Sequence, residues 1–69
     1  MDASYLGKTV RIQVKDGRSF FGILSSFTHK LDIILADSVE QQPANKNIHQ
    51  VAQVVIPGPD LVSVGLQRL

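Results

Sequence analysis

Residues 8–15 alternate strictly between polar and apolar side chains, and this pattern constrains the fold more than any other feature. The apolar positions in this stretch are all β-branched and fall on one face. A period of two over this length is typical of a β-strand with one buried face. Asp16-Gly17 follows, a pair that favours a two-residue type I′ turn with positive φ at both positions. The sequence therefore predicts a β-hairpin whose second strand begins at Arg18.

Four further segments have strand character and are short enough to belong to a small sheet. They cover residues 18–27, 31–39, 50–56 and 61–66. Gly22 interrupts the first of them, and a glycine inside a strand commonly marks a sharp bend or a close backbone approach. Five short strands separated by close turn signals predict an all-β fold. We expect a small, five-stranded, strongly bent antiparallel barrel.

The connections between these segments are polar or rich in proline and glycine. Residues 40–49 lack periodicity and contain Pro43, which predicts a surface loop. Two prolines within residues 57–60 end the fourth strand abruptly, because proline lacks the N–H that a ladder needs. At the start of the chain, residues 2–6 are predicted to form one helical turn that stops at Gly7. No repeat or second domain is visible, so residues 1–69 are interpreted as a single domain.

A chain of 69 residues without cysteine has few means of stabilising itself alone. Domains of this size gain little net free energy from one small core, and disulfides and thiolate metal sites are absent. Oligomerisation or docking into a larger complex is the remaining support. Seven basic against six acidic residues give almost no net charge, which counts against RNA binding, and Arg18 and Lys30 are interpreted as ordinary surface charges. No apolar run could span a membrane, so we expect a soluble, cytoplasmic protein.

The sequence offers little that would support catalysis or cofactor binding. Ser25, Ser26 and His29 with Asp32 or Asp37 supply the residue types of a hydrolytic triad, but serine and histidine are common in turns. The two histidines lack the spacing and the number of ligands that zinc requires. No glycine-rich phosphate loop is present. We therefore expect a non-enzymatic chain with no cofactor and no metal.

Strands 50–56 and 61–66 carry no charged residue on either face, which is unusual for strands at a sheet edge. Exposed apolar edges aggregate unless a partner pairs with their backbone. This predicts an obligate subunit, although strands buried on both sides of a barrel would leave the same apolar signal. The residues predicted to form the partner interface are Val51, Val54, Val55, Ile56, Leu61, Val62 and Val64.

Together these features resemble a known family, the Sm and Sm-like (LSm) proteins. The first Sm motif is similar to Asp16-Gly17-Arg18-x-Phe20-x-Gly22-x-Leu24-x-x-Phe27 followed by Leu31-x-Ile33-x-Leu35, and the second to Ile56-x-Gly58-x-x-Leu61-Val62. Leu6-Gly7-Lys8 resembles the usual lead-in to the first strand. The resemblance implies a bent five-stranded sheet whose edge strands, the fourth and fifth, join neighbouring subunits.

The RNA pocket that this resemblance implies is altered in several positions. In Sm proteins that bind oligouridine, a loop side chain and an arginine sandwich the base, and an asparagine reads its edge. Thr28 and Asp32 stand at the aspartate and asparagine positions, and Pro57 replaces the arginine before Gly58. An ionised carboxylate accepts hydrogen bonds but donates none. Only His29 remains able to stack on a base, which counts against RNA binding at this site.

One branch of the family departs in a similar way, namely the Sm-like auxiliary subunits of the NatC N-terminal acetyltransferase. The likeness is carried by Asp16-Gly17-Arg18, by the strand after Leu31 and above all by Val55-Ile56-Pro57-Gly58-x-x-Leu61-Val62-Ser63-Val64. This resemblance implies a non-catalytic subunit of a ribosome-associated complex that acetylates nascent chains beginning with Met and a large apolar residue. Its partners would be the catalytic and large auxiliary subunits.

Two other functions fit the same sequence. The first is an RNA-binding Sm-like ring subunit that acts in RNA processing or decay. The second is a small-barrel adaptor that binds a peptide by adding a strand to its edge.

Overall fold

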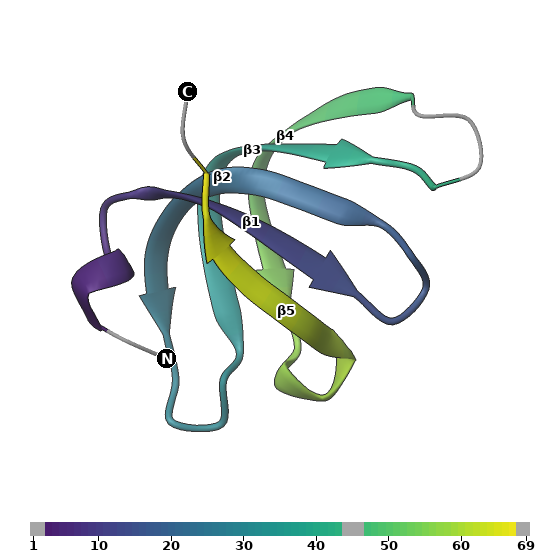
Figure 1. The fold of residues 1–69 in the computed structure, drawn as a ribbon. Helices are drawn as coiled ribbons and strands as arrows, with labels where there is room; N and C mark the ends of the chain where they lie inside the picture. The colour runs from purple at the N-terminus through teal and green to yellow at the C-terminus, as the bar shows by residue number, and fades with distance from the viewer. Residues whose placement is uncertain (1–2, 44–46, 68–69) are drawn as a thin grey trace.

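The computed structural model describes residues 3–43 and 47–67, which form one five-stranded antiparallel sheet with two short 3₁₀ turns (Figure 1). The elements are η1 (Ala3–Tyr5), β1 (Thr9–Val14), β2 (Ser19–Phe27), β3 (Ile33–Gln41), β4 (Ile48–Ile56), η2 (Gly58–Asp60) and β5 (Leu61–Leu66). The strand order is β4-β3-β2-β1-β5. The predicted bent five-stranded antiparallel fold is confirmed, and β4 and β5 are its two edges.

The core lies on the concave face of this sheet and is almost entirely aliphatic. Its buried side chains are Val10, Ile12, Val14, Phe20, Leu24, Ile33, Leu35 and Ile56. They come from the first four strands, and the alternating residues of β1 predicted to face inward are among them. Burial of apolar area contributes about 25 cal/mol per Å², so this one cluster is the main source of stability within the chain.

The turn between β1 and β2 differs from the predicted type I′ hairpin. The Gly17 N–H donates to the Val14 carbonyl at 3.0 Å, and the Val14 N–H donates to the Arg18 carbonyl at 3.1 Å. Only Gly17, at φ 95°, has positive φ in this turn. These bonds define a three-residue loop, in which a tight turn is followed by one left-handed residue. Asp16 keeps a negative φ, and its Oδ1 accepts the Arg18 N–H at 3.0 Å.

The β3–β4 hairpin extends further than the sequence predicts. Glu40 pairs with His49 and Gln41 with Ile48, so the polar connection predicted over residues 40–49 narrows to residues 42–47. Of these, residues 44–46 lie outside the described part of the chain. The end of β3 and the start of β4 were predicted as loop because their residues are polar. Ladder hydrogen bonds join backbone groups, however, and polar residues such as Gln and His supply these as well.

At the bend of the sheet, the backbones of β2 and β3 approach each other closely. A Cβ at Gly22 would lie 2.7 Å from the Ser38 Cβ and 3.0 Å from the Ser38 Cα. The register of β2 against β3 shifts beside this contact, and Asp37 adopts a φ of 48°. Ser38 is fully buried, and its hydroxyl donates to the Val51 carbonyl at 3.0 Å. Gly22 is therefore the close-approach glycine that the sequence predicted.

The short N-terminal turn is tied to the sheet by backbone hydrogen bonds. Gly7, two residues after the end of η1, has a φ of 78°, and its N–H donates to the Leu24 carbonyl at 2.9 Å. Tyr5 packs against the core cluster. Of the helical turn predicted for residues 2–6, Asp2 lies outside the described residues, and Ala3–Tyr5 form a 3₁₀ turn, which confirms the short N-terminal helical turn. Within the described ranges, no helix has the length and apolarity to cross a membrane.

Candidate functional site

The loop between β2 and β3 is closed tightly by the Thr28 side chain. Thr28 Oγ1 accepts the N–H groups of Lys30 and Asp32, both at 3.2 Å. The backbone adds bonds from the Thr28 N–H to the Asp32 carbonyl at 3.0 Å and from the Leu31 N–H to the Thr28 carbonyl at 2.9 Å. Leu31 takes a left-handed φ of 66° to complete the loop. Thr28 therefore orders the loop backbone.

The link between β4 and β5 packs directly against this loop at the same end of the sheet (Figure 1). The Gly58 N–H donates to Asp32 Oδ1 at 2.7 Å. A Cβ at Gly58 would lie 2.2 Å from the Lys30 carbonyl oxygen, so only glycine fits at this approach. Two segments 26 residues apart in sequence thus form one joined surface, which we call the two-loop surface, made of residues 28–32 and 57–60.

The altered pocket positions from the sequence meet on this two-loop surface. Asp32 and Gly58 are in contact, whereas His29, Lys30 and Pro57 are exposed. The surface therefore offers an aromatic ring, a cation and a carboxylate whose position is held by a backbone donor. These are groups that stack on a base, attract a phosphate and accept hydrogen bonds from a base edge. Sequence reasoning found the residues but not the Asp32–Gly58 bond that joins them.

The seven residues predicted for the partner interface are not equally accessible. Val55 and Val62 are 59% and 60% exposed, whereas Ile56 is buried in the core at 3%. The other four are half-buried, and three of them (Val54, Leu61 and Val64) pack against the core cluster. Val55 and Val62 lie on opposite sheet edges, on β4 and β5. The interface role of all seven stays a prediction.

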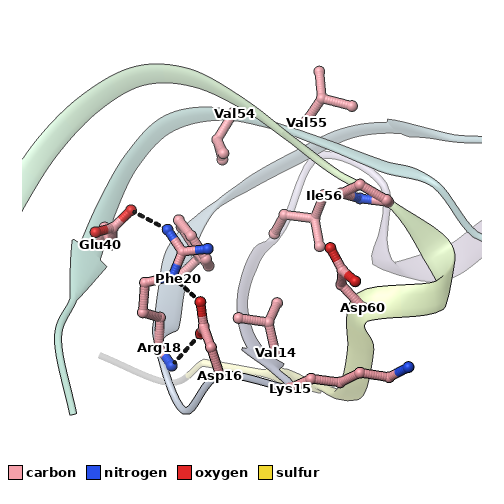
Figure 2. A pocket seen from close by; sticks show the side chains of 11 residues that line it. Val14, Lys15, Asp16, Arg18, Phe20, Glu40, Val54, Val55, Ile56 and Asp60 are labelled. Atoms are coloured by element: carbon pink, nitrogen blue, oxygen red, sulfur yellow. Dashed lines mark hydrogen bonds and ion pairs between the residues drawn. The ribbon is translucent and has the colours of Figure 1, made fainter.

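A cavity of about 290 Å³ opens between the β1–β2 hairpin, β4 and the β4–β5 link. Figure 2 shows Arg18 at its rim between two carboxylates. Arg18 Nε lies 2.7 Å from Asp16 Oδ2, and Nη1 lies 3.2 Å from Glu40 Oε1. The Arg18 guanidinium carbon is 5.4 Å from the centre of the Phe20 ring. Arg18 therefore joins the hairpin to β3, a role that its interpretation as a surface charge missed. The Asp16-Gly17-Arg18 run was the feature of the sequence that could have indicated this role of Arg18.

The contacts of Asp16 in this cluster lower its pKa. The Arg18 N–H, followed by the Arg18 guanidinium, lowers the pKa of Asp16 below its ordinary value of 3.8, although some desolvation opposes the shift. A carboxyl group with a lowered pKa stabilises the fold above its unfolded-state value, and this contribution is lost as pH falls through the folded-state value.

We expect Asp16→Asn to flatten the acid side of the stability profile. The amide oxygen still accepts the Arg18 N–H but no longer titrates, so wild type and variant should converge as pH falls below about 3.8. Urea unfolding midpoints measured from about pH 2 to pH 6 check this. An Asp16→Asn profile with the same acid slope as wild type would contradict the pKa assignment.

The residue types considered for catalysis do not assemble into a triad. Ser25, Ser26, His29 and Asp37 are exposed, and Asp32 Oδ1 accepts the Gly58 N–H. Within residues 3–43 and 47–67, no three histidine or carboxylate side chains cluster closely enough to hold a metal ion.

The fold is a small, bent five-stranded antiparallel sheet with β4 and β5 at its two edges, and comparison with known proteins specifies its family. Residues 2–66 match the LSM domain, so the chain belongs to the LSM domain family. A comparison with curated proteins finds no match.

Solved structures of Sm proteins are similar over nearly the whole chain. A heptameric archaeal Sm protein is 23% identical with a TM-score of 0.86, and the match covers 94% of this chain and 93% of that one. The Pyrococcus abyssii Sm protein in complex with a uridine heptamer is 25% identical with a TM-score of 0.83, covering 93% and 89%. The heptamer of P. aerophilum SmAP1 is 23% identical with a TM-score of 0.86, covering 94% and 85%.

These findings overturn the predicted partners. From the sequence, the predicted partners were the catalytic and large auxiliary NatC subunits and, through that complex, the ribosome, whereas RNA was an unlikely ligand. The three similar structures are instead of Sm proteins, of which two are heptamers and one is bound to uridine RNA. The error came from treating the altered pocket as a loss of function. The structure shows that its residues still form a joined surface with His29 and Lys30 exposed.

Proposed function

We propose that this chain is a subunit of an Sm-like ring of identical copies that binds single-stranded RNA. The observation that carries the proposal is the position of β4 and β5 at the opposite edges of one bent sheet. Neither strand contains a charged Lys, Arg, Asp or Glu side chain. Such unprotected edges favour pairing with another chain. Because the two edges differ, their pairing is head to tail, and such contacts close into a ring when the rotation allows it.

The RNA part of the proposal is supported by the two-loop surface. In a ring every copy presents the same His29, Lys30 and Asp32, so a single strand would meet the surface repeatedly. Stacking on an aromatic ring contributes about 1–3 kcal/mol per base, and Lys30 supplies a cation for the phosphate. The uridine heptamer bound to the Pyrococcus abyssii Sm protein, at 25% identity, supports this ligand class.

Native mass spectrometry of the purified chain, with and without an oligouridine strand, tests both parts together. We expect a discrete multiple of the subunit mass, which gains the mass of one strand when RNA is added. Val62→Lys should break the ring, because Val62 is 60% exposed on the edge strand β5 and a lysine there opposes strand pairing.

Ile23→Lys is the matched control for this experiment. Ile23 is 37% exposed, but it lies on β2, which is already paired with β1 and β3. The control should keep the ring mass. A wild-type chain that stays monomeric at micromolar concentration would refute the ring, and a ring that gains no RNA mass at low salt would refute the RNA ligand.

A further inference from the structure

The carboxylate of Asp32 lies where the two loops meet, and its position is held by the backbone. Oδ1 accepts the Gly58 N–H at 2.7 Å, and Asp32 is half-buried. The Asp32 N–H is bound in turn by Thr28 Oγ1 at 3.2 Å. A group restrained from both loops loses little conformational freedom when it binds a ligand, which favours selectivity.

The chemistry of this group restricts which base it recognises. A carboxylate accepts hydrogen bonds through about four lone pairs on its two oxygens and donates none. The bond from Gly58 uses only one of these positions. The remaining positions match a base edge that presents neighbouring N–H donors and are repelled by an edge that presents carbonyl oxygens.

We propose that the two-loop surface selects guanine over uracil through Asp32, an inference that rests on the RNA-binding function proposed above. The Watson–Crick edge of guanine carries two adjacent donors, the N1–H and the 2-amino group, which pair with both oxygens of a carboxylate. Uracil offers one N–H between two carbonyl oxygens. Adenine and cytosine each offer one amino donor beside an acceptor nitrogen. Guanine alone fits the carboxylate with two hydrogen bonds.

The other exposed groups of the surface are compatible with this choice. The His29 ring can stack on a purine, which has the larger face, and Lys30 offsets the repulsion between the Asp32 carboxylate and the phosphates. Neither group distinguishes guanine from adenine. The preference therefore belongs to Asp32, and substituting Asp32 should change it without abolishing RNA binding.

Fluorescence anisotropy with short labelled strands tests this preference. The strands carry isolated guanines between adenines, which avoids guanine tetrads, and matched strands carry inosine or uridine at the same positions. A bidentate pair with the correct base discriminates by about tenfold, so the wild-type ring should bind the guanine strand about tenfold tighter than the uridine strand. Inosine lacks the 2-amino donor and should lose most of that advantage.

Asp32→Asn is the decisive variant, because its amide oxygen still accepts the Gly58 N–H while its NH₂ group supplies a donor. We expect it to keep the ring and to prefer uridine, whose edge alternates donor and acceptor. His29→Ala should weaken binding of all three strands similarly.

The outcomes separate this inference from the proposed function. A wild-type ring that binds uridine as tightly as guanine, or a guanine preference that persists in Asp32→Asn, would overturn the selectivity and leave the RNA-binding function intact. Failure of the wild-type ring to bind any strand at low salt would overturn both.

Discussion

Gly58→Ala is expected to lower the free energy of unfolding by about 3 kcal/mol, because backbone atoms must move to admit one methyl group. The new Cβ would lie 2.2 Å from the Lys30 carbonyl oxygen and 3.2 Å from the Leu31 carbonyl carbon. Both contacts are with backbone, so no side-chain rotation relieves them. The two loops must separate, which also lengthens the 2.7 Å bond from Gly58 to Asp32.

The loss should appear in binding as well as in stability. We expect the midpoint of urea unfolding to shift to a lower denaturant concentration. We also expect RNA affinity to fall by more than the loss of ring stability explains, because the two-loop surface comes apart. Gly65→Ala on β5 is the matched control, since a Cβ there meets no atom within 4 Å. A Gly58→Ala protein as stable as Gly65→Ala at equal subunit concentration would show that the loops are not joined as described.

Local patterns predicted the strands well because strand formation in this chain follows local side-chain alternation. The interval from Leu61 to Leu66 was predicted residue for residue, and the inward face of β1 follows from its period of two. The ends of β3 and β4 were missed, because the pairing of Glu40 with His49 depends on the partner strand and not on either side chain.

The turn chemistry was predicted only in part, for a physical reason visible in one residue. Asp-Gly is common in type I′ turns, but here Asp16 also accepts the Arg18 N–H and pairs with the Arg18 guanidinium. These bonds accompany a three-residue loop in which Asp16 keeps a negative φ. A dipeptide preference does not include such contacts with the following residue.

In the candidate site, too, the chemistry of each residue was predictable from the sequence, whereas the contacts between distant residues were not. The acceptor-only character of Asp32 follows from the sequence, whereas its bond to Gly58 joins positions 26 apart. Without that bond the substitutions at Thr28, Asp32 and Pro57 resemble the loss of a pocket. With it they form an ordered surface of different chemistry, which the prediction from sequence against RNA binding did not include.

Gly22→Ala is expected to destabilise the protein by about 3 kcal/mol through the bend of the sheet. The added Cβ would lie 2.7 Å from the Ser38 Cβ, 3.0 Å from the Ser38 Cα and 3.1 Å from the Ala36 carbonyl oxygen. Ser38 is fully buried and its hydroxyl is bound to the Val51 carbonyl, so neither strand has room to move aside. Urea unfolding at fixed subunit concentration measures the loss.

A double-mutant cycle with Ser38→Gly isolates the contact responsible. Ser38→Gly alone should cost about 1–2 kcal/mol, because the hydroxyl bond to Val51 is lost and a glycine enters a strand. In the Gly22→Ala background the same change removes the 2.7 Å collision, so it should cost less or even restore stability. The Cβ added at position 22 would then still lie 3.0 Å from the Cα of residue 38, so the rescue should be partial. Strict additivity of the two substitutions would mean that the β2–β3 bend does not depend on the approach of Gly22 to Ser38.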